Sequence, residues 1–448
     1  MAIIKFPNQM RWGVATASYQ IEGAVNEGGR GKSIWDTFSK TPGKVLNGDH
    51  GDVACDSYHR YQEDVDIISD LGVDFYRFSI SWPRIFPNGT DEVSQAGLDY
   101  YHRLVDALLE KGIEPMCTLY HWDLPQALQD KGGWENRETI QAFTAYAALM
   151  FKEFKGKINY WITFNEPWCA SFLSNYYGKH APGNTDLQIA VNVAHHMNVA
   201  HGKAVMALRE IDEEANIGFA PNTEWNEPYS NTPEDIKACE LANGFFIDWF
   251  FDPVFKGHYP EAIVEIFRKN NAFLHLEDGD MEIISQPIDF LGVNYYTGGV
   301  ARYQENAGLF ETERVDTGRQ KTDIGWDIYP EGFYNVLTHI SNTYGDIPIY
   351  ITENGSCYND EPHNGRVVDE KRIDYLKRHL VALNRAIKSG VNIKGYIAWS
   401  LLDNFEWAEG YSMRFGLVHV DYRSLKRTKK ESFYWYKHML NNNFFETN

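Results

Sequence analysis

The stretch TFNEP at residues 163–167 decides the fold together with a counterpart, ITENG, at residues 351–355. In each, a β-rich apolar run ends in a turn, and a glutamate, Glu166 or Glu353, stands where the run ends. The two runs are therefore interpreted as strands that deliver a carboxylate at their carboxyl ends. A pair of carboxylates held across a cleft can divide acid and nucleophile roles between them. Since the chain has 62 acidic residues, the setting of these two matters more than their number.

Eight short β-rich runs of this kind are distributed along the chain. They span 11–15, 73–80, 114–120, 158–164, 216–220, 288–294, 347–352 and 393–399. Several are apolar without strict alternation, which is typical of strands buried on both faces of a parallel sheet. Helical periodicity is clear between them at 100–110, 139–154, 186–210, 236–250 and 372–388.

This alternation of strands and helices predicts right-handed crossovers and a parallel sheet. Eight units fit a closed barrel better than an open doubly wound sheet, which should carry a glycine-rich nucleotide fingerprint after its first strand. The sequence has none there, and no linker or low-complexity tract divides it. The predicted fold class is α/β, as a single-domain (β/α)8 TIM barrel over residues 1–448. Long βα loops are expected at 16–53, 222–233 and 295–327.

Composition excludes several classes of function. Hydrophobic residues make up 43% of the 448 residues and charged residues 23%, enough for a large packed core. The formal net charge of −20 argues against nucleic-acid and anionic-membrane partners, because both require basic surfaces. No apolar run approaches the roughly 18 residues of a membrane span, and the amino terminus has no signal-peptide pattern.

The five cysteines are scattered and show no C-x-x-C spacing. Buried free thiols in a reducing compartment are the expected state, with a cytoplasmic location as the default. No metal or organic cofactor is implied, and a homo-oligomer is left open.

The ends of the predicted strands carry an unusual set of side chains. Solvated loops would show Lys, Ser and Asp, whereas these ends carry Trp, His, Asn, Gln, Arg and Glu. Such residues stack on sugar rings and bind neighbouring hydroxyl groups through two hydrogen bonds. The pattern favours a cleft that binds a polyol.

Several further motifs lie in order along the chain. They are GVATASYQIEG (13–23), RFSISWPRI (77–85), YHWDLP (120–125), NYY (294–296) and AWSLLDNFEW (398–407). With the two glutamate motifs, they make the chain resemble glycoside hydrolase family 1 from residue 6 to residue 436. The resemblance implies a (β/α)8 barrel with β-glucosidase or β-galactosidase activity.

The same resemblance implies roles for individual residues. Glu166 would act first as general acid and then as general base, and Glu353 would be the nucleophile. A separation of about 5 to 5.5 Å between the two carboxyl groups would imply retention of configuration. Arg77 and Tyr296 would keep Glu353 anionic, and Asn294 would support the site.

The remaining matched residues would bind the sugar. The glycone contacts implied by the resemblance are Gln20, His121, Asn165, Tyr296, Trp399, Glu406 and Trp407. Trp168 and Trp326 would form walls on the aglycone side. The resulting hypothesis is a retaining, exo-acting β-glucosidase that takes cellobiose, short cello-oligosaccharides and aryl or alkyl β-glucosides, with β-galactosidase and β-fucosidase side activities.

Three alternatives stay open. A 6-phospho-β-glucosidase would share the fold, but its phosphate would lie near Glu406. At about 4 Å and an effective dielectric of 20, that repulsion is roughly 4 kcal/mol per unit charge. A noncatalytic sugar-binding protein would typically have lost one glutamate. A metallohydrolase could use His195, His196 and His201, although these lie in a helical stretch without the spacing of a zinc site.

Overall fold

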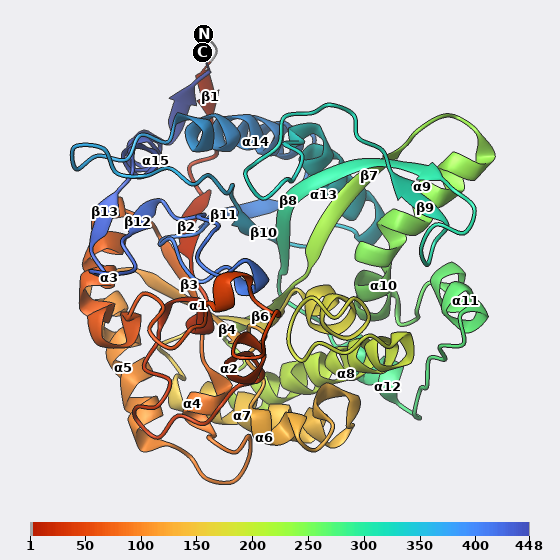
Figure 1. Ribbon diagram of the computed structural model, residues 1–448, viewed down its shortest axis with the longest axis horizontal. Helices are drawn as coiled ribbons and strands as arrows, with labels where there is room; N and C mark the ends of the chain where they lie inside the picture. Colours follow the sequence, from red (N-terminus) through yellow and green to blue (C-terminus); the bar gives the residue numbers. More distant parts are fainter. Residues whose placement is uncertain (1–2, 448) are drawn as a thin grey trace.

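The computed structural model, which describes residues 3–447, confirms the closed parallel barrel (Figure 1). Its strands are β2 (Arg11–Ala15), β3 (Phe75–Ser79), β4 (Glu114–Tyr120), β5 (Tyr160–Asn165), β6 (Asn216–Ala220), β8 (Leu291–Tyr303), β10 (Ile349–Asn354) and β11 (Ile393–Trp399). Hydrogen-bonded neighbours follow the order β6-β5-β4-β3-β2-β11-β10-β8. The ring closes between β6 and β8, where Asp289 N donates to Ile217 O at 2.9 Å and Asn294 N to Pro221 O at 3.1 Å.

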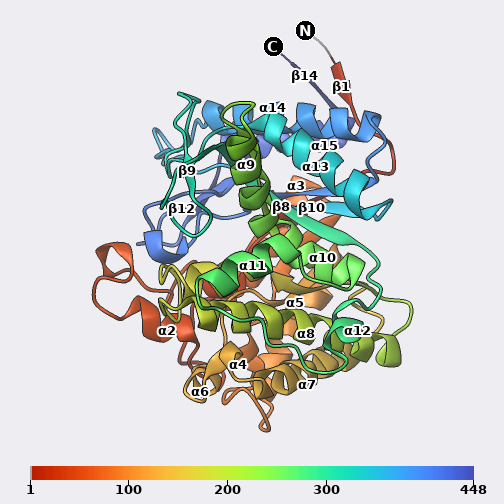
Figure 2. The ribbon, with the colours of Figure 1, turned by 90° about the vertical axis from the view of Figure 1, so that its right-hand side faces the viewer.

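Helices surround the barrel (Figures 1 and 2). The longer ones are α3 (Ser57–Leu71), α5 (Gln95–Glu110), α7 (Glu138–Glu153), α8 (Leu187–Ile211), α9 (Pro233–Phe246), α10 (Asp248–Lys256), α11 (Glu261–Lys269), α13 (Pro330–Tyr344), α14 (Glu370–Lys388) and α15 (Glu431–Asn442). The two ends of the described chain meet where β1 (Ile3–Lys5) pairs antiparallel with β14 (Phe444–Glu446). Of residues 3–447, no helix is long and apolar enough to cross a membrane.

The expected strands and helices agree with the structure apart from one helix, whereas parts of all three expected loops are ordered elements. The loop expected at 16–53 contains the short helices α1 (Ser18–Ile21) and α2 (Ile34–Ser39), and the loops expected at 222–233 and 295–327 contain strand residues. The helix expected at 236–250 is two helices, α9 and α10, divided at Ile247. Ile247 is buried, as are Phe245 and Trp249 two residues to either side of it. The apolar periodicity therefore continues through the break and does not reveal it.

The loop expected at 222–233 was wrong for its first half. Residues Asn222–Pro228 form strand β7, which pairs in parallel with the outer part of β8. β8 itself continues beyond the barrel to Tyr303 and pairs with the short antiparallel strand β9 (Thr312–Arg314). The polar composition of NTEWNEP is typical of a loop, and the strand forms because β8 offers its edge. This extension builds one wall above the barrel.

Two apolar cores hold the barrel in place. The larger lies between strands and helices, and the smaller fills the barrel interior with Phe75, Met116, Ile162, Phe290 and Ile397. These interior side chains lie below the carboxyl ends of the strands. They therefore form the floor on which polar residues at those ends rest.

Closure of the barrel depends on a close approach at Gly218 of β6. A Cβ added there would lie 2.2 Å from the carbonyl oxygen of Phe290, a backbone atom that cannot move without opening the closing seam. We expect Gly218→Ala to lower the free energy of unfolding by about 2 kcal/mol, the range for overpacking. Gly244→Ala on α9 is the control, because its Cβ would meet only the movable carboxylate of Asp248 at 3.1 Å. Urea denaturation of both variants measures the difference, and equal midpoints would contradict the role of this seam.

Candidate active site

A cavity of about 510 Å³ opens where the barrel strands end. Ten of the residues singled out in the sequence line it: His121, Asn165, Glu166, Trp168, Tyr296, Trp326, Glu353, Trp399, Glu406 and Trp407. Arg77 and Asn294 lie beneath them, and Gln20 lies beside Glu406, all three buried. The structure thus brings together every residue that the sequence placed in one site.

Glu353 lies at the end of β10 between two strong donors. Arg77 Nη1 donates to its Oε1 at 2.6 Å, and the Tyr296 hydroxyl donates to its Oε2 at 2.6 Å. Burial raises the pKa of Glu353, and Arg77 and Tyr296 oppose that rise by stabilising the anion. Both carboxylate oxygens are therefore held by groups that favour the ionised form.

The guanidinium of Arg77 also joins the two carboxylates into one network. Its Nη2 donates to Asn165 Oδ1 at 2.7 Å, and Asn294 Nδ2 donates to the same oxygen at 2.9 Å. Asn294 Nδ2 donates further to Glu166 Oε1 at 2.9 Å. Glu353 and Glu166 are thus connected through three buried side chains, all of which are hydrogen-bonded.

Glu166 follows β5 in a constrained backbone conformation. Its φ is +47°, which a side chain other than glycine rarely adopts, and its N–H donates to Ala220 O of the neighbouring strand at 2.8 Å. Burial, and then the negative charge of Glu353, raise the pKa of Glu166 to about 8. Near neutral pH this carboxyl therefore holds a proton, as a general acid must.

Aromatic and polar groups form a layered wall in another part of the cavity lining. The His121 ring stacks on Trp399 and on Trp407, with centroids 5.7 and 5.9 Å apart. Its Nε2 lies 3.0 Å from Asn165 Nδ2, and burial holds the pKa of His121 well below its usual range. A neutral imidazole here can accept a hydrogen bond from Asn165 and offer its other nitrogen to a ligand.

Glu406 provides a third carboxylate in the cavity. Gln20 Nε2 donates to its Oε2 at 3.4 Å and is also held by the Asn404 side chain at 3.0 Å. Burial, and then the charges of Glu353 and Glu166, raise the pKa of Glu406 to about 8. Burial and mutual repulsion thus favour the protonated form of two of the three carboxyls.

Sequence reasoning missed several residues of this site, and four of them show why. Trp122 donates from Nε1 to Asn165 O at 2.9 Å, and Thr352 donates to Asn294 Oδ1 at 2.6 Å. Trp122 lies in the YHWDLP motif and Thr352 in the ITENG motif, so their position beside predicted site residues could have identified them. Phe246 of α9 and Glu224 of β7 also line the cavity, and no local pattern marks them.

The histidines considered for a metal site have other partners. His195 lies 2.9 Å from Asp280 Oδ2 and 3.0 Å from the Tyr259 hydroxyl. His201 lies 2.7 Å from Thr163 Oγ1. All three histidines belong to α8, and in the described part of the chain no group of His, Cys, Asp and Glu is arranged to hold a metal ion. Contacts between helices and barrel account for them.

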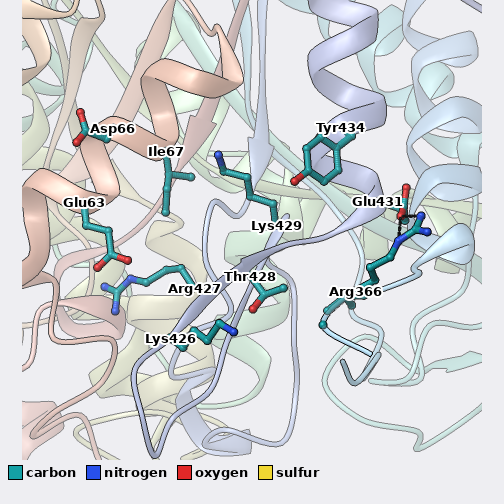
Figure 3. Close-up of a pocket in the computed structure, with 12 residues that line it drawn as sticks. Glu63, Asp66, Ile67, Arg366, Lys426, Arg427, Thr428, Lys429, Glu431 and Tyr434 are labelled. Atoms are coloured by element: carbon teal, nitrogen blue, oxygen red, sulfur yellow. Dashed lines mark hydrogen bonds and ion pairs between the residues drawn. The ribbon is translucent and has the colours of Figure 1, made fainter. Parts of the chain in front are cut away.

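A larger hollow of about 890 Å³ lies elsewhere on the surface (Figure 3). It is bordered by α3, β13 (Arg427–Lys429) and the start of α15. Its charges are mostly paired, as Arg366 is with Glu431, Arg427 with Asp64 and Lys429 with Asp70. None of the proposed site residues lines it, so its size does not make it a competing active site.

Comparison with known proteins gives consistent similarities. The family model described as "Glycosyl hydrolase family 1" matches residues 3–445. The chain is 49% identical to "Beta-glucosidase A" of Acetivibrio thermocellus over 99% of this chain and 100% of the relative. It is 42% identical to a "Bifunctional beta-D-glucosidase/beta-D-fucosidase" of Bifidobacterium breve, with 97% of this chain and 98% of the relative covered. The solved structure of a family 1 β-glucosidase from Thermotoga maritima superposes with a TM-score of 0.96 at 48% identity, covering all of both chains.

The hydroxyl of Tyr296 should control the ionisation of Glu353. Tyr296→Phe removes one of the two donors to the anion, so the pKa of Glu353 should rise by about one unit. Carbon-13 NMR of glutamate side-chain carboxyls, titrated in the free protein, measures this shift. Tyr295→Phe is the matched control, because the Tyr295 hydroxyl donates to Tyr329 O on the other side of the strand. An unchanged Glu353 titration in Tyr296→Phe would contradict the assignment.

Proposed function

The chain belongs to glycosyl hydrolase family 1, and on that basis we propose that it is a retaining, exo-acting β-glucosidase. It removes terminal β-D-glucosyl residues from cellobiose, short cello-oligosaccharides and aryl or alkyl β-glucosides. The observation that carries the proposal is the unequal setting of two buried carboxyls. Glu353 is bound by Arg77 and Tyr296, whereas the side chain of Glu166 accepts hydrogen bonds only from neutral groups within residues 3–447, Asn294 and Cys169. Glu166 and Glu353 come from distant parts of the chain, and we therefore propose that residues 1–448 form one catalytic domain.

In the first step Glu353 Oε attacks the anomeric carbon while Glu166 gives its proton to the glycosidic oxygen. The bond between that carbon and oxygen breaks, the aglycone leaves as an alcohol, and Glu353 becomes an ester. Arg77 and Tyr296 favour this step by keeping the nucleophile ionised before it attacks.

In the second step the charge relationship reverses. Once Glu353 is an ester its negative charge is gone, so the repulsion that raised the pKa of Glu166 disappears. Glu166, ionised after its proton transfer, then removes a proton from water, and the resulting hydroxide attacks the same carbon. The bond between that carbon and the Glu353 oxygen breaks, which returns Glu353 as a carboxylate. Glucose leaves with its original configuration, and Glu166 is protonated again.

The glycone end should recognise hydroxyl groups of an unmodified sugar. Gln20 and Glu406 can bridge adjacent hydroxyls, His121 and Asn165 can bind others, and Trp399 offers a flat floor. Trp168 and Trp326 lie in the aglycone half. The relative from Bifidobacterium breve, named for both glucosidase and fucosidase activity, supports β-fucosidase side activity here. β-Galactosidase side activity rests on the family resemblance.

The 6-phosphate alternative is disfavoured for a reason different from the expected one. Because Glu406 has a pKa near 8, it is largely protonated near pH 7 and repels a phosphate less than a full charge would. The stronger argument is the lining itself: among its described residues, Lys179 is the only lysine or arginine. A phosphate dianion would lose its hydration and could gain only this one exposed lysine as a cationic partner. The sugar-binding alternative is disfavoured because both glutamates are present and connected.

Exchanging each glutamate for a small residue should distinguish their roles. With an activated aryl β-glucoside, Glu353→Gly plus azide should give α-glucosyl azide, since azide attacks from the face that the nucleophile vacated. Glu166→Ala plus azide should give β-glucosyl azide, since azide then replaces water on the glycosyl-enzyme. Product anomers are read by proton NMR.

Anomers exchanged between the two variants would reverse the assignment of the acid and the nucleophile. For the unaltered protein, a first-formed α-glucose from a β-glucoside would contradict retention itself. Glu166→Ala should also spare substrates with good leaving groups in the first step, because they need little protonation.

The substrate class is tested by initial rates on cellobiose and on cellobiose 6′-phosphate, phosphorylated on the non-reducing sugar. We expect turnover of cellobiose at least about a hundredfold faster, which corresponds to roughly 2.7 kcal/mol. Preference for the phosphorylated substrate would keep the mechanism and overturn the substrate assignment. If neither substrate nor an aryl β-glucoside were cleaved, a noncatalytic sugar-binding role would replace the proposal.

A further inference from the structure

The two oxygens of the Glu166 carboxyl have different neighbours. Oε1 accepts a hydrogen bond from the side-chain amide of Asn294, and an amide NH₂ can only donate. Oε2 lies 3.3 Å from the Sγ atom of Cys169, the only hydrogen-bond partner of Oε2 within residues 3–447. In the neutral acid the proton is therefore best placed on Oε2. This is the oxygen that must face the leaving group.

The backbone fixes the Cys169 thiol beside that oxygen. Cys169 begins a π-helical turn, Cys169–Leu173, three residues after Glu166. Ala170 N donates to Glu166 O at 3.2 Å, and Ser174 Oγ donates to Cys169 O at 2.8 Å. Cys169 is buried and lines the cavity. The thiol cannot leave Oε2 by backbone motion unless this turn unwinds.

We propose that Cys169 is a positioning residue for the acid/base, which orients Oε2 of Glu166 toward the glycosidic oxygen and sets how tightly Oε2 holds its proton. The inference rests on the proposed glycosidase function. A thiol is a weak donor, so it steadies the ionised carboxylate without competing strongly for the acid's proton. A hydroxyl would stabilise the anion more and weaken the acid's hold on its proton, and a methyl group would give no hydrogen bond.

The other groups around Glu166 are the same in every variant of Cys169. They therefore cannot cause a difference in pH dependence between the variants. Burial and the charge of Glu166 keep the pKa of the thiol well above its usual range, so it stays an S–H donor. The charged or titratable groups that act on Glu166 or on Cys169 come from β3, β7, β8, β10 and the segment after β11: Arg77, Glu224, Tyr296, Glu353 and Glu406.

The test compares Cys169→Ser, Cys169→Ala and the unaltered protein through the pH dependence of kcat/KM on a slow alkyl β-glucoside. The alkaline limb reports the acid/base in the free enzyme. Serine should move it to lower pH by about 0.5 to 1 unit, and alanine should leave it at or above the original value. The acid limb, which reports Glu353, should stay in place in both variants.

Cys239→Ser is the matched control, because Cys239 is also buried but its thiol bonds Asn226 O on β7. It makes the same exchange of sulfur for oxygen and should move neither limb. A merely structural role for Cys169 would lower kcat or raise KM equally at all pH values, and coincident alkaline limbs in all proteins would overturn the proposal.

A second measurement does not depend on turnover. In infrared difference spectra, the S–H stretching band of Cys169 is identified as the band that is absent from Cys169→Ala. We expect the frequency of this band to shift as the carboxyl of Glu166 ionises. In Glu166→Ala the frequency should stay constant over the same pH range. A band that never responds to Glu166 would overturn the proposal even if β-glucosides are hydrolysed. A responsive band in a protein that cleaves no β-glucoside would instead retain this contact and refute the proposed function.

Discussion

One buried cation, the guanidinium of Arg77, sets the charge balance of the whole cavity. It contacts Glu353 directly and reaches Glu166 through Asn165 and Asn294. Glu166, Glu353 and Glu406 face the same enclosed space, where charges interact more strongly than in water. One cation can stabilise one anion well, so the other two carboxyls hold their protons to higher pH. In the proposed mechanism, the division of labour between acid and nucleophile follows from which carboxyl Arg77 contacts.

The barrel makes that contact possible because Arg77 reaches across its interior from one strand to another. Arg77 on β3 donates to both Glu353 and the carbonyl oxygen of Thr352 on β10, and the two strands β2 and β11 lie between them around the ring. Gly292 on β8 leaves room for the Thr352 side chain, since a Cβ there would lie 2.9 Å from it. Thr352 in turn holds Asn294, which holds Glu166. A small residue in a strand, Gly292, therefore contributes to the geometry of the proposed site as well as to the packing.

Much of this arrangement could be predicted from the sequence. The rest could not, and the reasons are physical. The strands at 11–15, 114–120, 216–220 and 393–399 have the expected bounds because each is apolar, buried and ends at a polar turn. Glu166 and Glu353 could be placed because they follow such strands directly. Strand β7 could not be predicted, because it forms by pairing with β8 and its polar residues show no strand pattern of their own. For the same reason Glu224 and Phe246 gave no signal: they reach the cavity only through the β7 extension and the packing of α9.

Burial explains why the site costs stability as well as why it can react. The folded-state pKa values of Glu166 and Glu406, at about 8, lie above the ordinary range of a glutamate. A group whose pKa is raised on folding contributes stability below its unfolded pKa, and that contribution is lost as the pH rises through its folded pKa. Both groups therefore weaken the fold progressively between about pH 4.5 and pH 8. Solvating them would remove this cost, but it would also lower the pKa of Glu166 and leave no proton for the leaving oxygen. The large apolar cores around the barrel allow the fold to tolerate a cluster that could not be stable by itself.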